Sequence, residues 1–401
     1  MCRMSIIVQK YGGACLSSFD KIEDIAKEVV KRKKEGNNVI VVVSAMGNTT
    51  SKLYKSAYKI SKTPPKRELD MLLTAGERIS MAMLSIAIQK RGVESISFTG
   101  SQVGVITDNI HSNAHIIRIK GDRVWEEIKK ERIVIIAGFQ GVSKSREVTT
   151  LGRGGSDISA VAIAAAFGAE ICEMYKDVSG IYSINPVFIG KAKLLKTLSY
   201  DEAIVLAKYG ADVVHYRACE IAAKFTVPIR ITNSFYRNGG TLIKEDINIE
   251  SGKVRAIAVK DKVVLISSND STDMNIKEIF KLIENSSVEI LHYSESRKKN
   301  RTLFNLFLSY YNRDEIRVIT NEIKMKSNLR MQVKRIKTIS LVGTGITSNI
   351  NVINRCTEAL SRLNIFPLFT FTGNINITFA VKSKDILPLV KSFNKEFELS
   401  E

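Results

Sequence analysis

The sequence predicts an α/β fold in which helices cover both faces of a mostly parallel central sheet, followed by a region of smaller α/β modules. Short apolar strands alternate with amphipathic helical segments up to about residue 245, and glycines follow several of the strands. A weak repeat in the C-terminal part is the third observation behind this prediction. Ligands bind beyond the C-terminal ends of the strands in such sheets, so we expect the functional site there.

The elements of the first region follow one another at short intervals. In Phe19–Lys34, apolar residues recur with helical spacing and charges lie opposite them, which predicts an amphipathic helix. The other predicted elements are strands at Ser5–Gln9, Val39–Val43 and Ile133–Ile136, a helix that carries Leu69, Leu72, Leu73 and Glu77, and an alanine-rich helix from about Ser156 through Phe167.

A glycine-containing turn and a polar stretch predict a domain boundary. The turn lies at residues 237–240 and the polar stretch at 244–253. We therefore predict a first domain at residues 1–245, a small α/β module at 246–335 that the C-terminal segment completes, and a second module at 336–401. The modules are expected to contain strands at Val263–Ser267 and Thr338–Val342, each followed by a helix.

The composition is that of an ordinary globular protein, with 44% apolar and 25% charged residues. The five cysteines are scattered and form no CxxC pair, which favours reduced thiols in a cytoplasm. The apolar runs fall short of the ~18 residues that a membrane span needs, and the first residues do not resemble a secretory signal. We expect no membrane partner.

The net charge of +19 would allow nucleic acid or an anionic substrate as a partner. Residues 291–340 hold twelve Lys and Arg against four acidic residues. Because no aromatic residues alternate with these charges and no nucleic-acid-binding motif occurs, we interpret the region as a solvated face and expect no nucleic-acid partner.

Four polar segments carry the chemistry. Two follow predicted strands: in Lys10–Gly13 the glycines allow close approach to an anion and the lysine supplies charge, and Ser44–Gly47 could open a second anion site. Thr150–Asp157 places an arginine and two glycines at the start of a helix, an arrangement that suits an anion, although simple capping by the Ser-Asp pair would also explain part of it. The fourth, Lys176–Tyr182, has an acid near its start.

Together the four segments favour phosphoryl transfer to a small anionic acceptor. The sequence contains neither a Walker A motif nor a protein-kinase catalytic loop, and no GxGxxG opens a helix after the first strand. These absences exclude P-loop NTPases, protein kinases and the usual dinucleotide-binding fold.

The sequence resembles the aspartate kinases of the amino-acid-kinase fold over residues 5–400. The segments KYGGACLSS (10–18), VVVSAMGNTT (41–50), ELDMLLTAGER (68–78), AGFQG (137–141), TTLGRGGSD (149–157), KDVSGIYSINP (176–186), GADVVHYRA (210–218) and VPIRITNSF (227–235) are similar to motifs of that family. The C-terminal modules resemble ACT domains, which are βαββαβ units that bind amino-acid effectors.

The resemblance implies ATP-dependent phosphorylation of L-aspartate to 4-phospho-L-aspartate, the first step towards lysine, threonine and methionine. On the nucleotide side it implies that Lys10 contacts the phosphates and the transferring phosphoryl group. Gly12 and Gly13 would cradle the phosphates, Asp177 and Tyr182 would hold the nucleoside, and Mg²⁺ would bridge the β- and γ-phosphates.

On the acceptor side, the resemblance implies that Ser44 and Thr50 hold aspartate and that Glu77 holds its amino group. Arg153 would bind a carboxylate, and Asp157 would organise the cations at the reaction centre. The other residues implied at this end are Gly154, Gly155 and Ser156. Lys10, Arg153 and Asp157 are the candidate catalytic residues.

Several positions depart from the family pattern. Ala14-Cys15 replaces Thr-Ser, and we interpret Cys15 as a small core residue. At the ATP end Lys176 replaces a threonine, and Asp212 stands where the family has a phosphate-binding lysine. We expect Lys176 to compensate by pairing with Asp212 or with a phosphate, and Mg²⁺ held by Asp212 is a further alternative.

In the ACT-like modules, Asn269–Met274 lacks the usual Pro-Gly, and Asn351 stands where a glycine is usual. We therefore predict a homodimer through these modules whose inhibition by lysine or threonine is weakened or absent. Two alternatives stay open: a catalytically weak homologue that acts as an amino-acid-sensing regulatory subunit, and a kinase for another small carboxylate.

Overall fold

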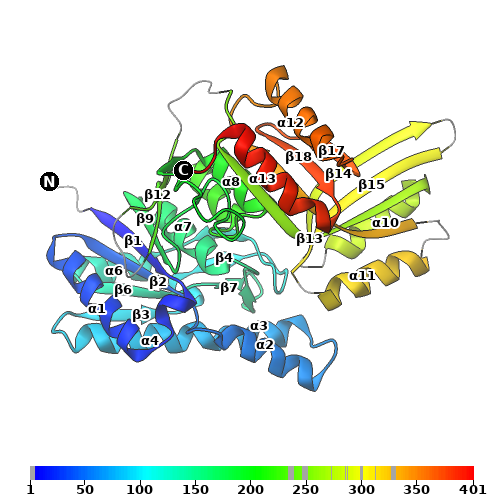
Figure 1. Ribbon diagram of the computed structural model, residues 1–401. Helices are drawn as coiled ribbons and strands as arrows, with labels where there is room; N and C mark the ends of the chain where they lie inside the picture. The colour runs from blue at the N-terminus through cyan, green and yellow to red at the C-terminus, as the bar shows by residue number, and fades with distance from the viewer. Residues whose placement is uncertain are drawn as a thin grey trace. The chain divides into compact units, whose positions relative to one another are not determined.

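The computed structural model describes residues 5–233, 239–245, 252–271, 273–284, 286, 288–298, 301–311, 313–326 and 331–401 (Figure 1). The chain divides into two compact units. The first unit is Met1–Ile181, Leu194–Ile204 and Val213–Ile247, and the second is Tyr182–Lys193, Val205–Asp212 and Asn248–Glu401. Much of the predicted boundary at 237–253 lies outside the described residues.

The first unit is built on an eight-stranded sheet whose neighbouring strands are all parallel except β11 and β12. The strands in spatial order are β10 (Thr197–Leu198), β12 (Thr241–Ile243), β11 (Ile229–Asn233), β9 (Ile171–Lys176), β1 (Ile6–Tyr11), β2 (Asn38–Val43), β6 (Ile133–Ala137) and β3 (Ser95–Phe98). The central strands β1, β2 and β6 are entirely buried, which explains their continuous apolar runs.

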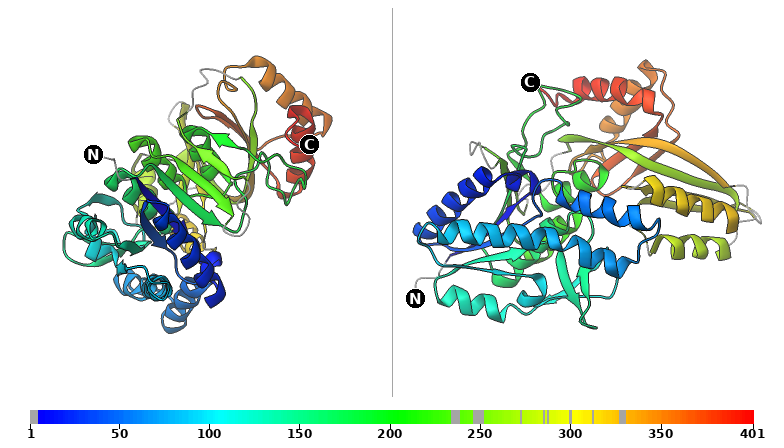
Figure 2. Two further views of the ribbon diagram at one scale, coloured as in Figure 1. Left: turned by 90° about the vertical axis from the view of Figure 1, so that its left-hand side faces the viewer. Right: turned by 90° about the horizontal axis from the view of Figure 1, so that it is seen from below.

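Helices pack on both faces of this sheet, as predicted. Helices α1 (Phe19–Lys34) and α4 (Ala75–Gln89) lie side by side (Figure 2) and share a core with β1 and β2. Helix α7 (Gly155–Phe167) packs against β1, β9 and α9 (Tyr216–Phe225). Since side chains alternate along a strand, β1 presents Tyr11 to the α1 side and Lys10 to the α7 side.

A four-stranded sheet and short helices complete the first unit. The sheet contains β5 (Ile116–Ile119), β4 (Val105–Thr107), β7 (Gln140–Ser143) and β8 (Val148–Thr150). The remaining helices are η1 (Gly13–Leu16), α2 (Thr49–Ile60), α3 (Lys66–Leu73), α5 (Gly100–Val103), α6 (Asp122–Lys129) and α8 (Tyr200–Tyr209), whose residues divide between the units.

The second unit contains a six-stranded antiparallel sheet. Its strands in spatial order are β14 (Glu289–Lys298), β15 (Arg301–Ser309), β13 (Ala256–Ser271), β16 (Met331–Val342), β18 (Asn376–Val381) and β17 (Phe369–Thr372). The helices are α10 (Asp273–Glu284), α11 (Arg313–Lys326), α12 (Ile350–Arg362), the short η2 (Ser383–Asp385) and α13 (Ile386–Phe397). In chain order β13, α10, β14, β15, α11 and β16 make a βαββαβ unit.

The long strands β13 and β16 each serve two cores. Val263–Ser268 pairs with Met331–Ile336, and beyond a bulge Ala256–Lys260 pairs with Thr338–Val342. Helices α10 and α11 contribute to one core, and α12 and α13 to the other. We expected the C-terminal segment to complete the first module. In the structure the first part of β13, Ala256–Lys260, pairs with the part of β16 that belongs to the second module. The module limits themselves stay a prediction.

One helical stretch, Lys66–Gln89, is long and apolar enough to cross a membrane by length and composition alone. No single apolar run in the sequence marks this stretch, which is long because α3 and α4 follow each other almost without a break. Half of its apolar window is buried within the protein, where α4 packs on α1, β3 and β6. This packing explains its apolar composition as that of a core helix.

Candidate active site

Two lysines and one aspartate form a buried cluster at the C-terminal edge of the large sheet. Lys10 Nζ lies 2.8 Å from Asp157 Oδ1, and Lys176 Nζ lies 2.8 Å from Asp157 Oδ2. Lys10 comes from the end of β1, Lys176 from the end of β9 and Asp157 from the first turn of α7. The backbone N–H of His215 also donates to Asp157 Oδ2, at 3.3 Å.

The cluster carries more positive than negative charge. Burial alone would raise the pKa of Asp157, but the ammonium groups of Lys10 and Lys176 hold it below its usual range. Burial lowers the pKa of Lys176, and its ion pair with Asp157 opposes that effect. One carboxylate thus faces two ammonium groups, and a buried site of this kind favours an additional anion.

Glycines bring two backbone loops together beside Lys10. Gly12 N–H donates to the Tyr175 carbonyl at 3.2 Å, and Gly47 N–H donates to the Gly13 carbonyl at 2.9 Å. A Cβ at position 13 would lie 2.7 Å from the Ala45 carbonyl, so only glycine fits there. The loops that follow β1 and β2 therefore contact each other beside Lys10.

Glu77, near the start of α4, is a buried carboxylate with a free oxygen. It is 3% exposed, and its Oε1 accepts from the Ala45 N–H at 3.2 Å. Its Oε2 is buried and accepts no hydrogen bond. Burial raises the pKa of Glu77 to about 7. An ammonium group of a ligand would suit this oxygen.

Arg153 lies on an exposed loop whose backbone is held by other residues. Gly152 and Gly154 on either side have φ of +76° and +68°, a conformation that favours glycine. Arg217 on α9 donates to the Leu151 carbonyl at 2.8 Å, which fixes the start of the loop. Arg217 lies in the segment GADVVHYRA (210–218), whose sequence alone did not predict this role.

A second residue that the sequence analysis missed is Asp70, which holds the strand before the Arg153 loop. Its carboxylate is fully buried and accepts from the Thr150 hydroxyl at 2.6 Å and from the Thr150 N–H at 3.2 Å. His111 and Ser112 contact the same carboxylate. An aspartate between Leu69 and Leu73 on an apolar helix face was the signal that could have identified it.

The other predicted site residues lie as follows. Ser44 and Thr50 are half-buried at the end of β2 and in α2, and Ser156 lies in the first turn of α7 against Gly138. Asp177 is exposed just after β9. Tyr182 and Asp212 belong to the second unit, so their roles stay predictions. Lys176 pairs with Asp157, and its expected pairing with Asp212 or a phosphate stays a prediction.

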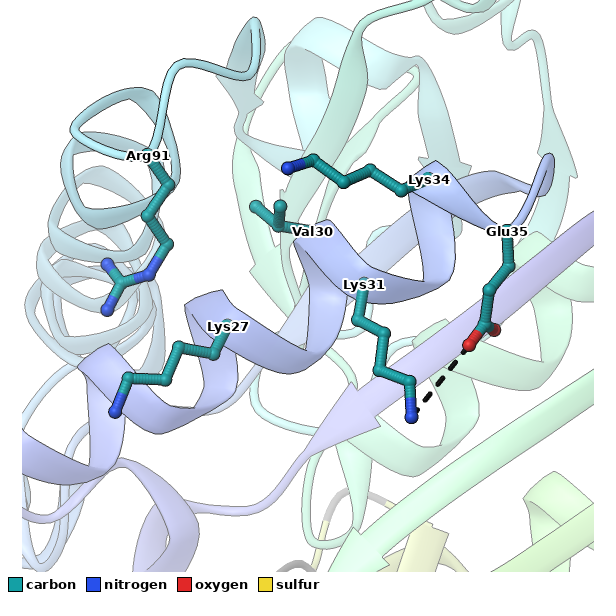
Figure 3. A pocket seen from close by; sticks show the side chains of 6 residues that line it. All are labelled: Lys27, Val30, Lys31, Lys34, Glu35 and Arg91. Atoms are coloured by element: carbon teal, nitrogen blue, oxygen red, sulfur yellow. Dashed lines mark ion pairs between the residues drawn. The ribbon is translucent and has the colours of Figure 1, made fainter.

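A basic pocket between α1 and α4 is separate from this cluster (Figure 3). It has a volume of about 530 Å³, and its lining residues are Lys27, Val30, Lys31, Lys34, Glu35 and Arg91. None of these side chains belongs to the lysine–aspartate cluster. Several lie in the last turns of α1, where lysines are favoured by the helix dipole.

The described side chains form no cluster of potential metal ligands. Among the residues that the structure describes, no group of three or more His, Cys, Asp and Glu could hold a metal ion. Asp157 is the acid at the cluster, and both of its oxygens already face lysines. The four described cysteines are free and buried, and Cys15 belongs to the core between α1 and the sheet, as interpreted.

Comparison with known proteins identifies the family. A model of the amino acid kinase family matches residues 5–233. Aspartokinases from Bacillus sp. strain MGA3 and Corynebacterium glutamicum are 36% and 37% identical to the chain; each alignment covers 99% of the chain, with 98% and 97% of the relatives' lengths. The chain belongs to the aspartokinases of the amino acid kinase family. The resemblance seen in the sequence motifs is therefore confirmed.

Solved structures of the family confirm the predicted fold class. E. coli aspartokinase III in complex with aspartate and ADP superposes with a TM-score of 0.81 at 20% identity, over 98% of this chain and all of that one. The aspartate kinase from Synechocystis is 28% identical, with a TM-score of 0.57 over 99% of this chain and 70% of its own. The fold is that of an amino acid kinase followed by ACT-like modules.

Proposed function

We propose that the chain transfers the γ-phosphoryl group of ATP to the side-chain carboxylate of L-aspartate, giving 4-phospho-L-aspartate and ADP. The observation that carries the proposal is the buried Lys10–Asp157–Lys176 cluster, in which two ammonium groups share one carboxylate. Its excess positive charge lies where a polyphosphate would approach the glycine loops. We infer L-aspartate as the acceptor from the aspartokinases, the family to which the chain belongs.

The cluster supports this reaction through position and charge. A carboxylate is already a nucleophile at neutral pH, so no side chain has to remove a proton from it. Charge spreads over the phosphoryl oxygens in the transition state, and Lys10 and Lys176 would stabilise that charge. Asp157 would keep both ammonium groups in place before the nucleotide arrives, which lowers the cost of orienting them.

The acceptor would lie between Glu77 and Arg153. The free Oε2 of Glu77 suits the α-ammonium group, and Arg153 suits the α-carboxylate. Ser44 and Thr50 would add hydroxyl contacts from the loop after β2. These roles come from the family resemblance, and the free oxygen of Glu77 supports the first of them.

At the nucleotide end, Gly12 and Gly13 would let the backbone approach the phosphates closely, and Asp177 and Tyr182 would contact the nucleoside. Among the described residues, no group of three or more His, Cys, Asp and Glu could hold a metal ion by itself. An ion that accompanies ATP would therefore be held chiefly by the phosphates and water, as Mg²⁺ often is.

The two alternatives make different predictions for one experiment. ADP release is measured with ATP, Mg²⁺ and a panel of acceptors: L-aspartate, L-glutamate, N-acetyl-L-glutamate and succinate. The proposal predicts release that depends on aspartate. Release with another acid only would indicate a different carboxylate kinase, and no release from a folded protein that binds lysine or threonine would indicate a regulatory subunit.

We expect the protein to act as a cytoplasmic homodimer.

A further inference from the structure

A second buried carboxylate bridges the same two strands on the opposite face of the sheet. Glu173 on β9 is 6% exposed, and Oε2 accepts from Gln9 Nε2 at 2.9 Å and from the Tyr175 hydroxyl at 3.0 Å. Its Oε1 accepts from Arg32 Nη2 of α1 at 2.6 Å. The Tyr11 hydroxyl donates to Gln9 Oε1 at 3.3 Å. We call these five residues the Glu173 network.

Two residues of the network are direct neighbours in the sequence of the two lysines in the candidate active site. Gln9 directly precedes Lys10 on β1, and Tyr175 directly precedes Lys176 on β9. Because neighbouring side chains on a strand point to opposite faces, Glu173 holds Gln9 and Tyr175 on the α1 side while Asp157 holds the two lysines on the α7 side. Each of the two strands is thus fixed by a carboxylate on either face.

Tyr175 extends the network to the glycine loop. Its ring stacks on Tyr11 with centroids 4.7 Å apart and planes at 7°. Its carbonyl accepts from the Gly12 N–H at 3.2 Å and from Cys15 Sγ at 3.4 Å. Burial, followed by the charge of Glu173, raises the pKa of the Tyr175 hydroxyl, so it remains a donor. A shift of this tyrosine would therefore move both the loop and Lys176.

We propose that Glu173 is a positioning residue, which acts through Gln9 and Tyr175 to set the places of Lys10, Lys176 and the Gly12 N–H. Arg32 neutralises the buried carboxylate, so that it can bind the two neutral donors. The expected effect on kcat rests on the proposed function. The contacts of Glu173 do not depend on which acceptor is phosphorylated.

Four variants test the proposal: Glu173→Met, Arg32→Met, the double change Arg32→Met/Glu173→Met, and the control Glu127→Gln. Removing one partner of a buried ion pair destabilises a protein, whereas replacing both partners with apolar residues is often neutral. Glu127 is a suitable control because it is also buried and pairs with an arginine, Arg132, at 2.8 Å.

We expect the double variant to recover part of the melting temperature that each single variant loses, because no unpaired charge remains buried, although Gln9 and Tyr175 still lack their acceptor. Its kcat should stay about tenfold below that of the parent, since misplaced reacting groups are costly. The KM for aspartate should change less than twofold. The control should keep its kcat. The proposal is overturned if kcat returns together with the melting temperature in the double variant, or if Glu173→Met leaves kcat unchanged.

A measurement without turnover separates this proposal from the proposed function. Amide exchange of Gly12 should be faster in the double variant than in the parent and unchanged in Glu127→Gln. Unchanged exchange at Gly12 would contradict the positioning role whatever the acceptor. If the parent released no ADP, the proposed function would be contradicted. The exchange rate of Gly12 would then still test whether Glu173 is a positioning residue.

Discussion

Lys176 and Asp157 form an ion pair of 2.8 Å on the carboxylate oxygen that Lys10 does not use. Lys176, which replaces a threonine of the family pattern, is therefore part of the Lys10–Asp157–Lys176 cluster. Its ammonium group is mostly buried, so its charge is little screened by solvent. This relationship makes Lys176 the first position to test.

The change Lys176→Thr should lower kcat/KM for ATP by about ten- to hundredfold. A hydrogen bond to a charged group contributes about 1.5–3 kcal/mol, and the variant loses one at the site of developing negative charge. Steady-state kinetics measures the effect. Lys34→Thr, at an exposed lysine of α1, is the matched control. Equal, small effects of the two changes would remove Lys176 from the active site.

Adding Asp212→Lys to the Lys176→Thr variant should restore part of the affinity for Mg-ATP. The family resemblance puts a cation at position 212, and an aspartate there repels phosphates. Two like charges ~4 Å apart repel by about 4 kcal/mol at an effective dielectric constant of 20. Isothermal titration compares the parent, the single and the double variant. If the double variant binds nucleotide no better than the single one, Asp212 has no part in the nucleotide site.

Arg153→Ala should reduce kcat/KM for aspartate by at least thirtyfold. The truncation of a charged hydrogen-bonded partner typically costs about 2–5 kcal/mol. The KM for ATP should change little, since Arg153 is assigned to the acceptor. A rate for aspartate within a few-fold of the parent would show that another residue binds the α-carboxylate.

Glu77 should make both stability and aspartate binding depend on pH. Burial raises its pKa to about 7 from 4.5, so the folded protein binds this proton more tightly than the unfolded chain does. The resulting stability is complete below pH ~4.5 and is lost as the pH rises through about 7, by about 3 kcal/mol in total. Urea unfolding at pH 5 and pH 8, compared between the parent and Glu77→Gln, measures this contribution.

In the same pH range the KM for aspartate should fall as Glu77 ionises, because a carboxylate binds the α-ammonium group better than a carboxylic acid does. Glu77→Gln should show a higher KM with little dependence on pH between 6 and 8. If the parent and Glu77→Gln share one pH profile, Glu77 does not bind the amino group.

Regulation by lysine or threonine should be weak or absent. In the second module, Asn349 caps α12 and its side chain accepts from the Asn351 N–H at 3.1 Å, so this amide is already occupied. The side chains of the corresponding turn, Asn269–Met274, lie outside the described residues. Inhibition assays and light scattering test the prediction. Inhibition at micromolar lysine or threonine, or a monomer, would contradict it.

The sequence predicted the central strands β1, β2 and β6 of the large sheet, because each is an apolar run with glycines shortly after it. The helix expected at Phe19–Lys34 has those limits in the structure. The pairing of Lys176 with Asp157 could not be predicted, since it depends on how β9 and α7 approach each other. Local pattern also missed Asp70 and Glu173, whose partners lie far away along the chain.

The most direct test of the proposed function is to identify the product by trapping. The purified protein is incubated with ATP, Mg²⁺, L-aspartate and hydroxylamine, which converts an acyl phosphate to a hydroxamate, and the product is identified by mass spectrometry. We predict aspartate 4-hydroxamate from the parent and a loss of at least a hundredfold in Asp157→Asn, which leaves Lys10 and Lys176 without their shared anion. No hydroxamate from a folded parent protein, or an undiminished yield from Asp157→Asn, would contradict the account.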